Sequence, residues 1–521
     1  MNRSEMWSRI HSHAQAWDMI VVGGGATGVG VAIDGASRGY DVLLLEQSDF
    51  GKGSSSRSTK LAHGGVRYLG QGNIGLVLDA LKERGLLLEN APHIVHELAF
   101  VVPNYDWWEA AFYGLGLKLY QLLAGKYGLG ASRILSREET LEHLPTLKIE
   151  GLRGGAVYYD GQFDDARLLI HMARTACEQG ATLLNYVEVV GVTKNAGGAV
   201  DGVSTRDVET GEEFHAAAKV VINATGAFSD RLRLAAEPGG APMIAPSQGI
   251  HLVFDGAFLA GESAIMVPQT SDGRVLFAIP WHGHTLVGTT DTAMQTVPLE
   301  PVAREEEIDF ILSTAGEYLA KAPTRDDVLS VYAGIRPLVR AANGAGTAEL
   351  SRDHVIQVGR SGLVSIMGGK WTTYRRMAQD CVDQAASLAS LPERPCATQQ
   401  LRIHGFHSDV KQLGALSVYG SDAVEIHKLA EGDPGLREQL HPALPYVKAE
   451  VIWAARYEMA RTVEDVLARR TRALILNARA ALEMAPAVAD LMAEELGWNE
   501  NSKANQLAAF REVAANYILH S

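Results

Sequence analysis

The sequence feature that most constrains the fold is a glycine-rich turn, VGGGATG, at residues 22–28. An apolar run at 19–22 leads directly into this turn, as a buried parallel strand does. Gly23 permits a tight turn, Gly25 lets a pyrophosphate approach the backbone, and Gly28 lets a helix pack closely on the strand. The turn therefore predicts the start of a nucleotide-binding α/β unit.

The residues after the turn complete this unit. Apolar residues recur at helical spacing from 29 to 36, so the first turn of a helix directs its free N–H groups toward bound phosphates. Gly39 ends the helix, and residues 42–45 form a second strand. Glu46 follows about 20 residues beyond the glycines, where a carboxylate accepts ribose hydroxyls. A dinucleotide site is predicted, and both nicotinamide and flavin cofactors remain open at this point.

The segment SSSRSTKLAHGGVRYL at 54–69 distinguishes the two cofactors. It is too polar and too rich in glycine for a core element, and it suits the edge and phosphates of a flavin. The segment resembles the FAD-dependent glycerol-3-phosphate dehydrogenases, whose Ser/Thr-rich flavin loop runs into the pattern seen here as KLAHGGVRYL at 60–69.

The resemblance covers most of the chain. Further blocks similar to that family follow in its order, at 164–168, 223–226, 249–251, 279–281, 288–291, 334–338, 351–353 and 368–375. The tail DVLARRTR at 465–472 is similar to the family's C-terminal domain. The resemblance implies FAD as a noncovalent cofactor and sn-glycerol 3-phosphate as the substrate.

We therefore expect an α/β (α+β) fold. It comprises a Rossmann-like FAD-binding domain of the glutathione-reductase/D-amino-acid-oxidase type, an antiparallel substrate domain and a C-terminal helical domain. The expected FAD-binding domain comprises residues 1–100, 160–245 and 335–390. Residues 101–159 and 246–334 form the substrate domain, and 396–521 form the helical cap.

Hydrophobic periodicity supplies the expected elements of these domains. Strands are expected at 182–192, 200–208, 213–218, 219–222, 250–254, 264–267, 275–279, 285–288, 354–358 and 363–367. Helices are expected around 308–319, from 368–370 to about 389, and through most of the chain beyond 395. A capping box is expected at 462–465, and Gly497 is expected to end a helix.

Composition excludes several classes of protein. A chain of 521 residues needs about two or three domains, and its net charge of -14 disfavours a nucleic-acid partner. Cys177, Cys381 and Cys396 are too few and too scattered for a disulfide framework or a metal site. Residues 1–17 carry charges without an apolar core, which argues against a secretory signal, and no apolar run is long enough to span a bilayer.

The chemistry implied by the resemblance needs a cationic clamp for a phosphate dianion. Arginine suits this role because its planar fork makes paired, charge-assisted hydrogen bonds. Arg67, Arg336, Arg352 and Lys370 are the candidates, and Tyr68 is expected to hydrogen-bond the substrate or to pack beside it. For any single arginine the competing interpretation is an ordinary ion pair on the surface or between domains.

Histidine is the best available base for the hydroxyl proton. His251 lies in a predicted strand of the substrate domain and is the first candidate, together with Arg336, for a catalytic role. A histidine satisfied within the core explains the same position. His63 is the alternative base, although its glycine neighbours favour a place in the flavin loop.

The expected cofactor contacts come from all three parts of the FAD-binding domain, and the N-terminus of a second helix near 370 is expected to stabilise the reduced ring. They are Gly23, Gly25, Gly28, Glu46, Ser54, Ser55, Ser58, Thr59, Lys60, His63, Gly65, Glu188, Ala224, Gly226, Arg336, Gly369, Lys370 and Thr372.

Electrons in the resembling family pass to a membrane quinone of the respiratory chain. The apolar, aromatic segment at 107–124 is typical of an interfacial helix, although a buried interdomain helix has the same pattern. We expect a cytoplasmic enzyme bound peripherally to the inner face of the cell membrane. A homodimer is a further expectation.

Other functions remain open from the sequence. They are an oxidase that passes electrons to oxygen, a flavin-dependent amino- or hydroxy-acid oxidoreductase, and a flavin-binding scaffold without catalysis. A second glycine-rich nucleotide unit is absent from the sequence, which argues against NAD as the electron acceptor.

Overall fold

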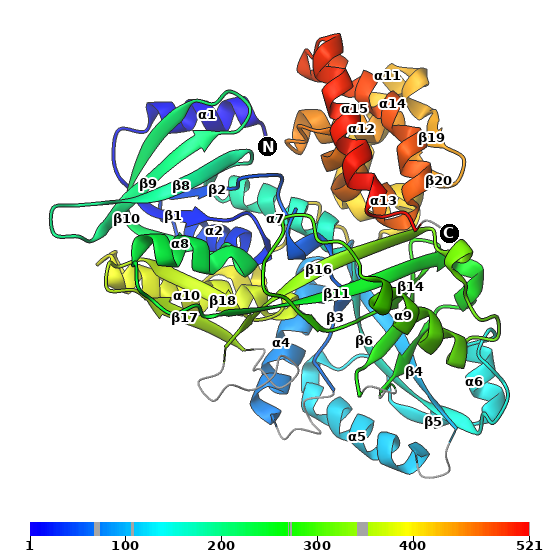
Figure 1. The fold of residues 1–521 in the computed structure, drawn as a ribbon. Coiled ribbons are helices and arrows are strands. Elements are labelled where there is room, and N and C mark those ends of the chain that lie inside the picture. Colours follow the sequence, from blue (N-terminus) through cyan, green and yellow to red (C-terminus); the bar gives the residue numbers. More distant parts are fainter. Residues whose placement is uncertain (67–72, 106–108, 269, 271–272, 341–352, 520–521) are drawn as a thin grey trace.

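The structure is a computed structural model that describes residues 1–66, 73–105, 109–268, 270, 273–340 and 353–519. Two large sheets lie beside each other, and the helices of the C-terminal part stand against one end of the second sheet (Figure 1). The expected α/β (α+β) fold class, with a Rossmann-like half, an antiparallel sheet and a helical C-terminal part, is confirmed.

The first sheet is mainly parallel and carries the glycine turn. Along the order β17-β18-β10-β1-β2-β7 the strands are parallel except for the edge strand β17, which is antiparallel to β18. The strands are β1 (Trp17–Val22), β2 (Val42–Leu45), β7 (Thr182–Leu184), β10 (Glu213–Asn223), β17 (His354–Val358) and β18 (Val364–Gly368). A chain that crosses repeatedly between parallel strands brings their carboxyl ends to one edge, which is where a nucleotide binds in such folds.

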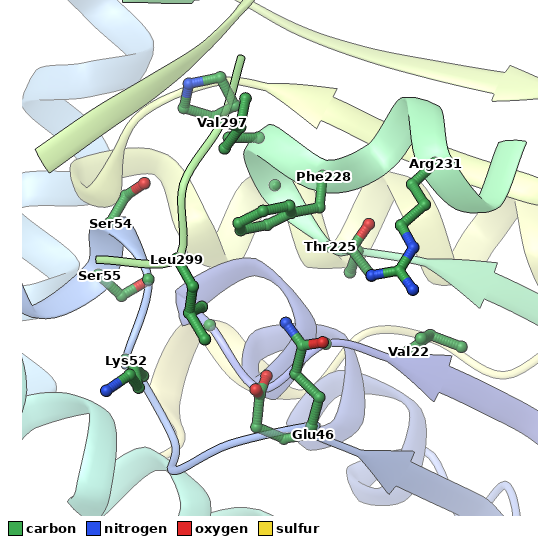
Figure 2. A pocket seen from close by; sticks show the side chains of 18 of the residues that line it. Val22, Glu46, Lys52, Ser54, Ser55, Thr225, Phe228, Arg231, Val297 and Leu299 are labelled. Carbon is green, nitrogen blue, oxygen red and sulfur yellow. The ribbon is translucent and has the colours of Figure 1, made fainter. Parts of the chain in front are cut away.

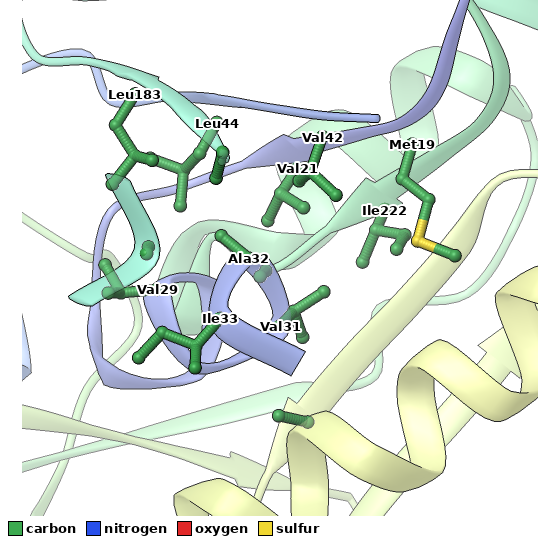
Figure 3. Packing of buried hydrophobic residues seen from close by; sticks show 14 of the residues in the cluster. Met19, Val21, Val29, Val31, Ala32, Ile33, Val42, Leu44, Leu183 and Ile222 are labelled. Carbon is green, nitrogen blue, oxygen red and sulfur yellow. The ribbon is translucent and has the colours of Figure 1, made fainter. Parts of the chain in front are cut away.

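Helices cover this sheet because its strands are apolar on both faces. They are α2 (Ala26–Ser37), α7 (Asp165–Glu178), α8 (Ser229–Ala236) and α10 (Tyr374–Leu388). Figure 3 shows Val29 and Ile33 of α2 beneath the strand residues Val21 and Leu44, all buried. Each such side chain contributes about 1.5–3 kcal/mol on burial. A side chain at Gly30 would lie 2.9 Å from the Tyr374 ring, so the glycine permits the close packing of α2 on α10.

One expected strand is wrong. Residues 182–192 form two strands, β7 and β8 (Val187–Lys194), because Tyr186 takes a left-handed conformation with φ 57° between them. β8 then pairs with β9 (Val200–Asp207), which forms the expected hairpin with β10. The predicted segments 213–218 and 219–222 join into the single strand β10.

The second sheet is antiparallel except where β12 runs parallel to β4. Its strands are β3 (Leu61–Ala62), β4 (Val95–Asn104), β5 (Arg133–Leu135), β6 (Gly154–Phe163), β11 (Ile244–Asp255), β12 (Ser263–Val267), β13 (Leu276–Trp281), β14 (His284–Gly288), β15 (Thr292–Ala293) and β16 (Ser330–Val339). Its helices are α4 (Ile74–Asn90), α5 (Glu109–Ala124), α6 (Arg137–His143) and α9 (Glu305–Tyr318).

Strands β11 and β16 form a long pair at one edge of this sheet, and they run from the first sheet toward the C-terminal helices (Figure 1). The expected domain limits at residues 100, 159 and 334 fall inside β4, β6 and β16 respectively. The division into domains therefore stays a prediction, and the ends of these strands are the better places for its limits.

The C-terminal part is largely helical, as expected. It contains α11 (Ala423–Gly432), α12 (Lys448–Tyr457), α13 (Ala473–Leu476), α14 (Ala478–Leu496) and α15 (Glu500–Ala515), with a small hairpin of β19 (Gln439–His441) and β20 (Leu444–Val447). The predicted capping box is present, since the Thr462 and Asp465 side chains accept hydrogen bonds from each other's backbone N–H. Gly497 ends α14 with φ 68°. At the other end of the chain, α1 (Arg3–Ser12) packs against the first sheet.

Candidate active site

A cavity opens at the carboxyl edge of the first sheet, next to the glycine turn. Its wall is formed by the turn itself, the loop after β2, the start of β8, the end of β10 and a segment at 297–301 (Figure 2). This cavity, called the first cavity below, lies where a parallel α/β sheet binds nucleotides.

The glycine turn makes the cavity accessible to a bulky anion. Gly23 has φ 111°, and a Cβ there would lie 2.7 Å from the Ala224 carbonyl oxygen. A Cβ at Gly28 would lie 1.9 Å from the Gly23 oxygen. Gly25 caps α2 without a side chain, and the Ser55 hydroxyl accepts a 2.9 Å hydrogen bond from the Ala26 N–H. This bare backbone at a helix N-terminus fits the pyrophosphate of a dinucleotide.

Glu46 lies at the end of β2 and lines the cavity, as expected. Its carboxylate accepts hydrogen bonds from the backbone of Gly24 (2.6 Å) and of Ser48 (2.9 Å). Burial raises the pKa of Glu46 more than these N–H groups lower it. The carboxylate is thus fixed in place at the position where a ribose would reach it.

A second cavity lies on the other side of β16. Ile335 and Pro337 line the first cavity, whereas Arg336 between them lines the second. Side chains alternate across a strand, so one strand forms a wall of both cavities. The second cavity is lined by Thr59, Leu61, His63, Gly65, Val66, Phe100, Tyr158, Asp160, Met266, Val275, Phe277, Thr289 and Arg336.

Arg336 is held in a defined position at the second cavity. Its guanidinium donates to the Thr289 hydroxyl at 3.1 Å and to the Gln248 carbonyl at 3.4 Å. A Cβ at Gly249 would lie 2.4 Å from the guanidinium, so this glycine leaves the space that the arginine fills. Gly249 is therefore explained by packing, because a larger residue there would displace the Arg336 guanidinium.

His251 is buried beside the second cavity and does not line it. Its Nε2 lies 2.9 Å from the hydroxyl of Thr59, which does line the cavity, and its ring stacks on Tyr332 with centroids 4.8 Å apart. Burial lowers the pKa of His251 well below its usual value, and the nearby cations of Lys60 and Arg336 lower it further. The imidazole is therefore neutral near pH 7.

Ser58 and Lys60, which were expected at the cofactor, do not line either cavity. Both side chains bond the buried carboxylate of Asp165, the Ser58 hydroxyl at 2.7 Å and the Lys60 ammonium at 2.7 and 2.9 Å. The Lys60 ammonium also donates to the Ser56 carbonyl at 2.7 Å, and the side chain is fully buried. These two residues tie the segment 58–60 to Asp165, the first residue of α7.

The other predicted cofactor residues fall into three groups. The first cavity is lined by Gly23, Gly25, Glu46, Ser54, Ser55, Glu188, Ala224 and Gly226, and the second by Thr59, His63, Gly65 and Arg336. Gly28, Gly369, Lys370 and Thr372 are not among the residues that line either cavity. The Thr372 hydroxyl accepts the His63 N–H at 3.2 Å, and Lys370 is the N-cap of the short 3-10 turn Trp371–Thr373. Arg67, Tyr68 and Arg352 lie outside the described residues.

The second helix N-terminus differs from the expectation. α10 begins at Tyr374, after the 3-10 turn Trp371–Thr373, and not at 368–370. Gly368 and Gly369 have φ of 74° and 78°, so the backbone turns here before it becomes helical.

Several lining residues were not predicted. They are Thr225, Phe228, Arg231 and the segment 297–301 at the first cavity, and Asp160 with an apolar wall at the second. Asp160 is buried, and it is paired with Arg84 (2.8 Å) and with the Tyr120 hydroxyl (2.8 Å). Pro298 and Pro301 mark 297–301 as a loop, but nothing local in the sequence brings it to the cofactor.

The glycine turn, the fixed acid after β2 and a cavity shared between two sheets define an FAD-dependent oxidoreductase, and residues 18–375 match the family model described as FAD dependent oxidoreductase. Residues 362–503 match the C-terminal domain of alpha-glycerophosphate oxidase. Among curated relatives, the mitochondrial glycerol-3-phosphate dehydrogenase of Macaca fascicularis is 41% identical over 97% of this chain and 73% of its own length. That of Arabidopsis thaliana is 40% identical over 96% and 86%.

The X-ray structure of the glycerol-3-phosphate dehydrogenase from Bacillus halodurans, complexed with FAD, has a TM-score of 0.81 at 30% identity and covers 99% of this chain and 98% of its own. L-alpha-glycerophosphate oxidase from Mycoplasma pneumoniae, with FAD bound, shares the fold with a TM-score of 0.57 at 18% identity. This chain belongs to the FAD-dependent glycerol-3-phosphate dehydrogenase family.

Proposed function

We propose that this enzyme oxidises sn-glycerol 3-phosphate to dihydroxyacetone phosphate by hydride transfer to FAD and passes the electrons to a quinone. The observation that carries the proposal is the alternation along β16. A cofactor in the first cavity and a substrate beside Arg336 in the second cavity meet across this strand.

FAD, when bound, supplies the hydride acceptor, and the residues of the first cavity hold it. Gly23, Gly25 and the N-terminus of α2 take the pyrophosphate, and Glu46 accepts hydrogen bonds from the ribose. Near β16, Ser54 lines the first cavity and Thr59, Leu61, His63 and Gly65 line the second, so these residues would border the flavin ring from the two sides.

Arg336 binds the substrate anion. Thr289 and Gln248 hold its planar fork beside the second cavity, where it is placed to donate to a phosphate or to the developing carbonyl oxygen. Arg67, Tyr68, Arg352 and Lys370 complete the clamp on the strength of the family resemblance.

His251 serves as the base through the Thr59 hydroxyl. The imidazole is neutral and hydrogen-bonded to Thr59, and Thr59 faces the substrate cavity. The substrate proton thus passes to Thr59 Oγ1 while the Thr59 proton passes to His251 Nε2. His63 lines the same cavity and is the alternative base.

Anaerobic reduction tests this function directly. Purified yellow protein is mixed without oxygen with glycerol 3-phosphate, and in parallel with glycerol and with lactate. We expect the flavin absorbance to bleach only with the phosphorylated alcohol. Bleaching with lactate or with an amino acid instead would favour the other flavin oxidoreductases of this fold.

A membrane quinone is proposed as the electron acceptor because the surface of α4 and α5 suits contact with a membrane. These helices are in contact, and they expose Ile74, Leu78, Leu119 and Leu122, the last with 77% of its surface accessible. Lys118 and Lys126 lie beside the leucines. Apolar side chains flanked by lysines suit a peripheral contact with an anionic membrane, here the inner face of the cell membrane. Among the described residues no helix is long and apolar enough to cross a bilayer.

A comparison of acceptors tests this part. Turnover with a soluble quinone analogue is expected to exceed turnover with oxygen, measured as hydrogen peroxide, by at least about tenfold. Equal or faster peroxide formation would make the enzyme an oxidase.

A further inference from the structure

The loop that lines one side of the first cavity is fastened from behind by the C-terminal part of the chain. Asp49 lies in this loop and is fully buried. It accepts a bidentate pair from Arg470 at 2.6 and 3.0 Å and a further bond from Arg469 at 2.5 Å. Two consecutive arginines of the 465–472 tail thus hold the backbone that carries Lys52, Gly53 and Ser54.

Lys52 forms a second link between this loop and the C-terminal part, an ion pair with Glu464. Its ammonium lies 2.5 and 2.7 Å from the two oxygens of Glu464, and Glu464 also accepts from Arg469 at 2.8 Å. Burial alone would raise the pKa of Glu464, but the cations of Arg469 and Lys52 lower it to about 2. The Glu464 carboxylate is therefore ionised near neutral pH.

The segment 297–301 lies beside this loop and lines the same cavity (Figure 2). Figure 2 shows Leu299 pointing into the cavity between Lys52 and Phe228. The next residue, Glu300, points away from the cavity, and its carboxylate accepts from Arg57 at 2.7 and 2.8 Å. The Tyr517 hydroxyl donates to the same carboxylate at 3.0 Å, and Lys52 lies 3.6 Å from it.

The residue Tyr517 comes from the segment after α15 and is fixed on the second sheet. Its carbonyl accepts from the Val331 N–H at 2.9 Å, next to the start of β16, and the side chain is buried. Tyr517 thus contacts β16 through its backbone carbonyl. Through its side chain it contacts Glu300 of the segment 297–301, called the cover segment below.

We propose that the C-terminal helical part is the latch of the flavin cavity: Tyr517 and Glu464 are positioning residues that keep the 49–57 loop and the 297–301 cover closed on FAD. The proposal rests on the flavin site described above and assigns the helical part a role in cofactor retention. Neither residue lines the cavity, so each acts only through Glu300, Lys52 and Arg469.

The experiment measures the release of FAD from the full-length holoenzyme, followed by the rise in FAD fluorescence after dilution. Tyr517→Phe removes one hydroxyl and leaves the ring in place. We expect release to be about five- to tenfold faster, the effect of one lost hydrogen bond to a charged group. Glu300→Gln tests the same bond from its other end and also weakens the Arg57 pair, so its release is expected to be faster still. Tyr457→Phe, at an exposed tyrosine of the same helical part, is the matched control and should be unchanged.

A merely structural role predicts a different pattern. In that case Tyr517→Phe lowers the unfolding temperature but leaves the release rate and the kcat at saturating FAD unchanged. The latch predicts faster release with the kcat at saturating FAD preserved. Wild-type protein that contains no FAD contradicts the flavin site itself, whereas FAD-loaded wild type with equal release in both variants overturns only the latch.

Discussion

The two cavities share strand β16, but their walls differ in how much is backbone and how much is side chain. Beside the glycine turn, the wall of the first is backbone of the turn, a helix N-terminus and strand ends, while the wall of the second consists of side chains from six strands and the loops between them. A backbone site tolerates little change in shape because its groups have no alternative conformations. A side-chain site tolerates substitutions of similar shape but loses its chemistry one group at a time.

Gly28→Ala should have the largest effect. The new Cβ would lie 1.9 Å from the Gly23 oxygen, and because that oxygen belongs to the backbone it cannot move aside as a flexible side chain could. We expect a loss of several kcal/mol of stability, about 3 or more, and protein without flavin absorbance. Gly75→Ala is the control, because open space surrounds that position in α4. A yellow, stable Gly28→Ala protein would mean that the turn is not rigid.

Arg336→Met should have the next largest effect and should act only on the second cavity. We expect kcat/KM for glycerol 3-phosphate to fall about a thousandfold or more, because an anionic ligand loses a preorganised charged partner. Arg336→Lys keeps the charge but not the fork, and it should recover part of the loss. Flavin content must stay normal in both variants, and exposed Arg360→Met serves as the control. Equal losses of FAD and of activity would show that the two cavities are not separable.

His251→Asn should slow anaerobic flavin reduction at least about a hundredfold and leave FAD bound. Thr59→Val should slow it similarly, and Thr59→Ser should restore it, because only the hydroxyl is needed. The histidine acts in its neutral form, and its pKa is well below the usual value. The reduction rate should therefore stay level as the pH falls from about 8 to about 6. A decline centred near pH 6.5 would assign the base to an ordinary histidine, with His63 as the first candidate.

Leu122→Glu should have the smallest effect and should leave both cavities unchanged. Sedimentation with anionic vesicles is expected to fall about tenfold, since one apolar side chain contributes about 1.5–3 kcal/mol when buried. Turnover with a soluble acceptor should be normal. Leu388→Glu, at an exposed leucine of α10, is the control. Unchanged sedimentation would remove α5 from the membrane contact.

The contrast between backbone and side-chain walls also explains which features could be predicted from the sequence. The turn at 22–28, Glu46 and the hairpin of β9 and β10 depend on local rules about glycine, strand ends and turns, and the structure confirms them. The strand at 182–192 failed because a non-glycine residue, Tyr186, takes a positive φ, which no local pattern indicates.

Side-chain direction is the information that the sequence lacks. Ser54, Ser55, Ser58 and Lys60 look equally suited to a cofactor, yet the first two line the cavity and the last two turn to Asp165, more than a hundred residues away. The cover segment 297–301 was missed for a related reason. Its position depends on Glu300 and Tyr517, which are separated by 217 residues.

The alternation along β16 also has a consequence for redesign. Ten paired positions with β11, from Ile244 and Val339 to Val253 and Ser330, set the register of this strand. Insertion or deletion of a single residue there would exchange every inward and outward position. Arg336 would then point toward the nucleotide, and an apolar neighbour would take its place beside the phosphorylated alcohol. Attempts to change the substrate of this enzyme are therefore best made on β12 or β13, whose Met266 and Phe277 line only the second cavity.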